Sequence, residues 1–253
     1  MEKLLKKTLF GILHEIHELK SYILIVLIFL VLSYSTYLVF DEKTLHNLTY
    51  EEGLFENLTA ICFFIAAIFF FRTYLLSRNL FFLFLCVIFL LGAGEELSWG
   101  QRIFNLKTPD FLNKINVQGE INFHNISLVN AKSKHGVAKL LTIEFQYKLF
   151  WLFYCVIIPF GVFFWEPLSL LTQKIRLPVP PITLGIFFLI NWVIFRITLS
   201  FLLPPNMSGQ YYWGINELME CVTAFLFMML SIYFFNSIIG RSHVCPTSKD
   251  PEL

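Results

Sequence analysis

The chain has 253 residues, of which 57% are hydrophobic and only 15% are charged, and its formal net charge is +1. An ordinary soluble domain has about 25% charged residues. This composition excludes a disordered chain and a small disulfide scaffold, and it excludes nucleic acid as a partner because nucleic-acid binding needs a basic surface. We therefore expect an integral membrane protein surrounded by membrane lipid.

The first segment, residues 1–20, is predicted to be a cytoplasmic amphipathic helix. Apolar residues recur there at helical spacing among basic ones, namely Leu5, Leu9, Ile12, Ile16 and Leu19. Such a helix lies in the membrane interface rather than across it. The apolar stretch that follows is long enough to span, so we expect an uncleaved anchor and not a signal peptide.

Six apolar stretches predict membrane-spanning helices, because a span needs about 20 mostly apolar residues. They are Tyr22–Phe40, Asn57–Phe71, Leu80–Gly94, Leu149–Trp165, Ile182–Leu203 and Ile215–Phe235. The expected fold is all-α, a polytopic helix bundle that forms one domain over residues 21–240. A partly helical outer loop at residues 95–147 belongs to this domain, and a cytoplasmic tail follows at residues 241–253.

The Lys and Arg residues that flank the spans place both termini of this cell-membrane protein in the cytoplasm. With that orientation, ten basic and six acidic residues lie inside, whereas eight basic and 12 acidic residues lie outside. Arg196 falls within a span and is left out of both totals. The outer face is therefore negative, and we expect the functional site there.

Glutamates lie at the predicted outer ends of three spans. Glu56 opens the second span, Glu96 ends the third and Glu220 lies near the start of the sixth. Charges at membrane depth are costly and usually face the bundle interior or a wet cavity. Arg196 lies about 10 Å below the outer end of the fifth span at a rise of 1.5 Å per residue. We expect it to pair with Glu220 or Glu56, either within a site or as a staple that only fixes helix packing.

The segments around two of these glutamates are similar. Glu56–Ala60 parallels Glu220–Ala224, and in both a Glu and a Thr are three residues apart and so share one helix face. The Thr is expected to hydrogen-bond its own helix backbone or to steady the Glu. An internal repeat with its site at the repeat interface and a coincidence of common residues both remain open.

Two polar blocks in the outer loop hold the other candidate residues. The first is Gly92–Arg102, and the second is Asn116–Asn125. His124 is a candidate base or metal ligand, because imidazole serves either role near neutral pH. The predicted catalytic residues are Glu56, Glu96, His124, Arg196 and Glu220; the predicted substrate-binding residues are Gln101, Arg102, Gln118, Glu120 and Asn125; the predicted ligands of a divalent metal ion are Glu95, Glu96 and His124. The alternative is that the amides only cap turns.

These two blocks resemble a family of uncharacterised bacterial multi-pass membrane proteins that carry GEExSWGQR and NxQGExNxHN motifs. The resemblance covers about residues 50–126 and implies a membrane location and a shared site, but no reaction. Glu95–Trp99 also resembles, locally, the EExxW opening of CAAX-type intramembrane proteases, which implies that paired Glu and distal His residues activate water for peptide cleavage. Those proteases have Arg-Gly directly afterwards, whereas here Gly100-Gln101 precedes Arg102, and the last three spans contain no His.

Three functions are consistent with these residues. The first is a metal-dependent hydrolase or transferase acting on a lipid or lipid-linked substrate, with carboxylates and His around a metal ion and Arg on a phosphate or carboxylate group. The second is a transporter coupled to protons or other cations. The third is a non-catalytic scaffold or an accessory subunit of a partner membrane protein, in which the polar residues only lock the helices together.

Overall fold

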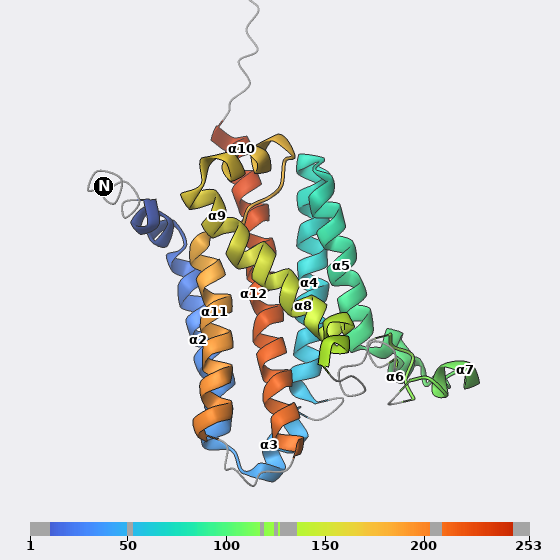
Figure 1. Ribbon diagram of the computed structural model, residues 1–253. Helices are drawn as coiled ribbons and strands as arrows, with labels where there is room; N and C mark the ends of the chain where they lie inside the picture. Colours follow the sequence, from blue (N-terminus) through green and yellow to red (C-terminus); the bar gives the residue numbers. More distant parts are fainter. Residues whose placement is uncertain are drawn as a thin grey trace, which may run out of the picture.

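A computed structural model describes residues 11–49, 53–116, 119–123, 126, 136–202 and 209–244. Within these ranges the chain is helical and contains no strand, apart from one isolated bridge between the backbones of Asn116 and Ile126 (Figure 1). The expected all-α bundle is therefore confirmed. Gln118, His124, Asn125 and the end of the tail lie outside the described residues.

The long helices are α2 (Lys20–Val39), α4 (Leu54–Ser77), α5 (Leu80–Glu96), α11 (Ile182–Ile197) and α12 (Gly209–Val244). A further long helix is built from α8 (Ile143–Trp151), η4 (Leu152–Ile157) and α9 (Ile158–Phe164) in direct succession. The short elements are α3 (Glu42–Thr49), η1 (Ser98–Gly100), α6 (Gln101–Phe104), α7 (Asp110–Asn113), η3 (Gly136–Leu141), α10 (Glu166–Lys174) and η5 (Thr198–Leu202).

In the described part of the chain, five helical stretches are long and apolar enough to cross a membrane. Four of them are Lys20–Val39, Ile143–Phe164, Ile182–Ser200 and Gly214–Gly240, and α4 (Leu54–Ser77) is the described apolar part of the fifth. The remaining predicted span corresponds to α5, which has 17 residues and runs beside α4 (Figure 1). At 1.5 Å per residue α5 is about 25 Å long, so the sixth span remains a prediction.

The helix of the sixth predicted span is longer than the sequence indicated, since α12 covers Gly209–Val244 rather than Ile215–Phe235. Two further spans are also markedly longer. The second begins at Leu54 rather than Asn57 and ends at Ser77 rather than Phe71, and the fourth begins at Ile143 rather than Leu149. Polar residues extend both helices at the predicted outer side: Glu56 lies in the first turn of α4, and the Thr142 side chain caps α8 by accepting from the Phe145 N–H at 3.3 Å. These extensions carry side chains of the candidate site.

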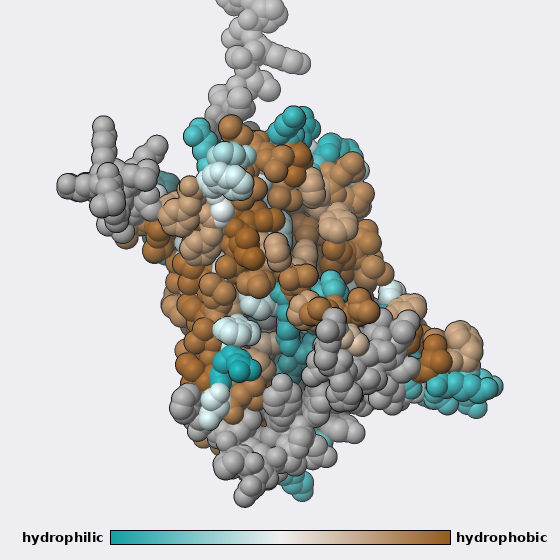
Figure 2. Space-filling model, viewed as in Figure 1, coloured by the Kyte–Doolittle hydropathy of each residue, from teal (hydrophilic) through white to brown (hydrophobic). Residues whose placement is uncertain are grey.

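The core is built around α12, which packs against α4, α11, α2 and α3 (Figure 1). Fully buried phenylalanines fill the space between helices. The ring centre of Phe227 on α12 lies 4.7 Å from the ring centre of Phe89 on α5 and 4.9 Å from that of Phe188 on α11. In lipid such close packing, and not the exclusion of water, holds helices together. On the face that Figure 2 shows, hydrophobic residues cover most of the bundle, as a membrane-embedded protein requires.

A close helix–helix contact joins α11 to η4. Pro159 has no N–H, so the Cys155 carbonyl four residues earlier loses its α-helical partner. The helix is π-helical over this stretch. The Cys155 oxygen then faces Gly185 of α11 so closely that any Cβ at position 185 would collide with it. The proline and the glycine together allow the two backbones to meet.

The described part of the N-terminal segment, residues 11–19, is helical and is attached to the bundle. A Glu15 carboxylate oxygen accepts a hydrogen bond of 2.6 Å from the Thr183 N–H in the first turn of α11. Negative charge is favourable at that helix end. The start of α2 and the end of α12 lie at one end of the bundle (Figure 1). We refer to the opposite end as the outer end, following the predicted orientation.

Candidate functional site

Four glutamates from three helices converge near the outer end of the bundle, and we refer to them as the acidic cluster. Glu56 comes from α4, Glu96 from α5, and Glu217 and Glu220 from α12. The Glu96 side chain lies within electrostatic range of the other three carboxylates. The packing of α4 against both α5 and α12 brings them together. Three of the predicted site residues therefore lie in one place, and Glu217 joins them.

The threonines beside the acidic cluster bond to their own helices. The Thr59 hydroxyl donates to the Phe55 carbonyl at 2.9 Å, and the Thr223 hydroxyl donates to the Met219 carbonyl at 2.8 Å. Of the two roles expected for these threonines, the structure therefore shows the backbone bond. Thr59 also contacts the Cys221 thiol across the α4–α12 interface, so the two similar segments face one another. The internal repeat itself remains a prediction.

Tyr147 of α8 completes this site. Its hydroxyl is buried and has no hydrogen-bond partner in the described structure. It lies within electrostatic range of Glu220 and Glu96, and its ring centre is 6.1 Å from that of Phe63 and 6.3 Å from that of Phe227. Within the described structure this hydroxyl is therefore the least satisfied polar group at the site. A buried polar group without a partner costs about 1–3 kcal/mol. Sequence reasoning missed Tyr147, because no pattern distinguishes it among ten tyrosines.

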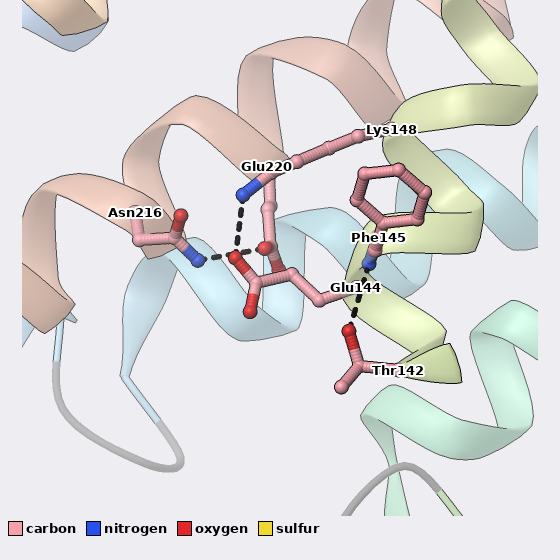
Figure 3. A network of polar contacts seen from close by, with 6 residues as sticks. All are labelled: Thr142, Glu144, Phe145, Lys148, Asn216 and Glu220. Atoms are coloured by element: carbon pink, nitrogen blue, oxygen red, sulfur yellow. Dashed lines mark hydrogen bonds and ion pairs between the residues drawn. The ribbon is translucent and has the colours of Figure 1, made fainter. Parts of the chain in front are cut away.

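Two polar contacts border the acidic cluster (Figure 3). The Asn216 amide donates to a Glu220 carboxylate oxygen at 2.7 Å, one turn away on α12. On α8, Lys148 forms an ion pair with Glu144, also one turn away. Glu220 is therefore oriented by its own helix, and the ammonium of Lys148 is held by Glu144.

Arg196 does not join the cluster. Its side chain is exposed, and within the described ranges no ion pair links it to Glu56 or Glu220. The physical reason is the helix rotation: Asn191 and Phe195 lie on the buried face of α11, and the next residue is turned by about 100° from Phe195. The predicted ion pair is therefore wrong, and Arg196 is separated from the carboxylates that it was expected to neutralise.

The two polar loop blocks contact one another through hydrogen bonds, which we refer to as the loop network. Glu120 accepts from the Ser98 hydroxyl and from the Asn122 amide on the same oxygen, at 2.7 Å each. The Gln101 side chain accepts from the Ile121 N–H at 2.7 Å and donates to the Thr108 hydroxyl at 2.8 Å. Gln101 and Glu120, predicted to bind substrate, thus hold the two blocks together. The Arg102 side chain lies outside the described part.

The neighbouring glutamates Glu95 and Glu96 face different surroundings. One Glu95 oxygen accepts from the Trp99 indole N–H and the other from the Phe123 N–H, each at 2.7 Å. The turn that follows has left-handed backbone at Ser98, Trp99 and Gly100, which folds the indole ring back over Gly94, where a Cβ would lie 2.9 Å from it. Glu95 therefore belongs to the loop network, and Glu96 belongs to the acidic cluster.

A metal centre made of Glu95, Glu96 and His124 stays a prediction. Within the ranges that the structure describes, no group of three or more His, Cys, Asp or Glu side chains is arranged to hold a metal ion. Glu95 and Glu96 contact different partners, and His124 is outside those ranges. The groups that the described site does offer, carboxylates and a phenol, suit a proton.

No protein-family model, curated protein or solved structure is significantly similar to this chain. Its functional assignment therefore depends on the geometry of the acidic cluster, Tyr147 and the loop network.

Proposed function

We propose that this integral membrane protein binds a proton, the simplest cation, at the acidic cluster and that the bound cation couples to transport. The observation that carries the proposal is that Glu56, Glu217 and Glu220 all lie within electrostatic range of Glu96. Glu96 and Glu220 also lie within range of the buried Tyr147 hydroxyl, which has no hydrogen-bond partner among the described residues. Carboxylates brought together in a medium of low dielectric constant repel one another strongly. A proton or another cation that binds among them offsets this repulsion.

The positions of the donors connect cation binding to helix position. The carboxylates come from α4, α5 and α12, and the phenol comes from α8. A cation bound among the carboxylates weakens the repulsion between the helices that carry them, and its release strengthens that repulsion. Intramembrane carboxylates serve proton and ion pathways in this way in pumps and transporters.

The test uses the full chain reconstituted into proteoliposomes and, in parallel, in detergent. Thermal stability is measured against Na⁺, K⁺, Mg²⁺, Ca²⁺ and pH, and cation or proton flux is measured in the liposomes. We expect at least one cation to stabilise the protein, and we expect Glu96→Gln to abolish both that stabilisation and the flux. Glu166→Gln, which changes an exposed glutamate on α10, is the matched control. A native chain that responds to no cation would refute the proposal.

A second candidate, a hydrolase or transferase acting on a lipid or lipid-linked substrate, is favoured by one observation. The Phe123 N–H is fixed on Glu95 at 2.7 Å, and His124 is the next residue in the chain. The test is to incubate the purified protein with membrane lipid extracts, with and without added divalent metal ions. Turnover that His124→Ala abolishes would support this candidate, and turnover by neither protein would count against it.

A further inference from the structure

A short arm leaves the bundle where α5 ends. This outer arm consists of residues 101–116 and contains α6 and α7. It projects sideways from the bundle, at a level where α11 and α12 continue further toward the outer end (Figure 1). Large apolar side chains of the arm are exposed: the exposed fractions are 71% for Phe104, 69% for Ile103 and 67% for Phe111.

The arm has an apolar and a polar side. In Figure 2 its hydrophobic atoms continue the apolar band of the bundle, and its hydrophilic atoms gather at the tip, on the side away from that band. The sequence of α7 and its end agrees with this view. Asp110 and Lys114 are four residues apart and share one face, and Phe111 and Ile115 share another. All four are exposed.

The arm is held in place by the loop network. Gln101 donates to the Thr108 hydroxyl at 2.8 Å, Thr108 in turn donates to the Gly119 carbonyl, and the Phe104 ring rests against Gly100. These contacts therefore hold the arm, with its exposed apolar side chains, in a fixed position. An exposed apolar surface of this kind marks an interaction site.

We propose that the outer arm docks into the membrane–water interface beside α5, with lipid as its partner. The apolar surface of the arm adjoins the apolar surface of the bundle, and the arm extends across the direction of the long helices. Ile103, Phe104 and Phe111 insert at the boundary between headgroups and acyl chains. Lys107 and Lys114 remain among the headgroups, as long basic side chains do at this depth.

Docking of the arm would fix the outer end of α5. The base of the arm is joined to Glu95 through Trp99, and Glu95 is adjacent to Glu96 of the acidic cluster. Contact of the arm with lipid would thus position Glu96, which contributes one carboxylate to that cluster. The proposed docking follows from the exposure and direction of the arm, so it does not depend on what the acidic cluster binds.

The experiment measures the surroundings of single spin labels in nanodiscs. The five native cysteines are replaced by alanine, and one cysteine is introduced by Phe111→Cys or Ile103→Cys on the apolar side, or by Asp110→Cys or Lys114→Cys on the polar side as matched controls. We expect the ratio of collisions with oxygen to collisions with a nickel chelate to be several-fold higher for the first pair. Equal access of the chelate to all four labels would overturn the proposal, and so would shielding of the first pair from both reagents.

A second measurement covers the case in which the cysteine-free chain does not fold. Phe111→Trp and Lys114→Trp are made in the chain with its natural cysteines, and quenching by brominated lipid is compared with that of the unchanged protein. We expect Phe111→Trp to increase the quenched fraction more than Lys114→Trp does. Equal quenching of both variants would contradict docking of the apolar side.

Discussion

Two polar sites inside this apolar bundle differ in how completely they are satisfied. At Asn191, which is 1% exposed, the side-chain oxygen accepts from the Tyr34 hydroxyl at 2.7 Å, and the amide nitrogen donates to the Met219 carbonyl and the Thr223 hydroxyl at 3.0 Å each. At the acidic cluster, by contrast, the Tyr147 hydroxyl is buried and has no hydrogen-bond partner among the residues that the structure describes. The first site links α2, α11 and α12 and leaves no polar atom of Asn191 to bind a ligand.

The difference separates a structural polar site from a binding one. A satisfied buried network makes a fold rigid and specific, whereas an unsatisfied group in the same low-dielectric surroundings stabilises whatever completes it. Both sites use α12, and Thr223 of the first lies one turn from Glu220 of the second. The comparison can be tested because it predicts opposite consequences for similar substitutions.

The largest effect on stability is expected for Asn191→Ala. The change leaves the Tyr34 hydroxyl and other buried groups without partners, which costs about 2 kcal/mol, toward the upper range for hydrogen bonds between membrane helices. The measurement is the unfolding temperature in detergent. The control is Asn236→Ala, because Asn236 is exposed and its one hydrogen bond within the described ranges is to the Tyr22 hydroxyl. Equal losses for the two variants would contradict a special role of Asn191.

Two tyrosine-to-phenylalanine changes give the sharpest contrast. Tyr34→Phe removes a 2.7 Å hydrogen bond and is expected to cost about 1 kcal/mol of stability. Tyr147→Phe removes a hydroxyl that has no partner in the described part of the chain, so the apo protein should be unchanged or slightly more stable, while its stabilisation by the bound cation decreases. Both are read from thermal unfolding with and without the cation. A destabilising Tyr147→Phe without cation would show that its hydroxyl has a partner after all.

Asn122→Ala tests the loop network, and we expect its effect to be local. Asn122 donates to Glu120 at 2.7 Å and accepts from Asn116 at 2.9 Å, so the loss of about 1 kcal/mol should appear where these bonds act. Amide hydrogen exchange should accelerate at Ile121 and Phe123 and stay unchanged in α12. Unchanged exchange at both amides would indicate that the other bonds of the network suffice.

The smallest effect on stability is expected for Glu96→Gln. The substitution keeps the shape of the side chain and removes one acidic group from the acidic cluster, so the apo protein should unfold at the same temperature or slightly higher. The measurement is thermal unfolding across the cation series, with Glu166→Gln as the comparison. A clear loss of apo stability in Glu96→Gln would show that Glu96, like Asn191, is a structural polar residue and not a binding one.

The spans were predictable because membrane thickness demands long apolar stretches, and such stretches are visible in any sequence. Their outer ends were less predictable, since polar residues such as Glu56 continue the helix there. The direction in which Arg196 points was not predictable. α11 is apolar on nearly all sides, so no periodicity shows which face packs against protein and which faces lipid.

The candidate site was predictable in part. The glutamates at the span ends were recognisable because charges are rare at that depth, and the density of polar residues drew attention to the two loop blocks. The missing partner of Tyr147 and the satisfied bonds of Asn191 were not recognisable. Both depend on contacts between helices far apart in the chain, which one sequence does not display.

The contact between Gly185 and the Cys155 carbonyl has a mechanical consequence. Where two helix backbones touch with no side chain between them, neither can slide or rotate without losing that fit. α11 and the helix that contains η4 should therefore move as a single body. Any motion that opens or closes the acidic cluster must then be a motion of α4, α5 and α12, which carry its carboxylates. A larger residue at position 185 would separate α11 from the helix that contains η4 and allow those two helices to move independently.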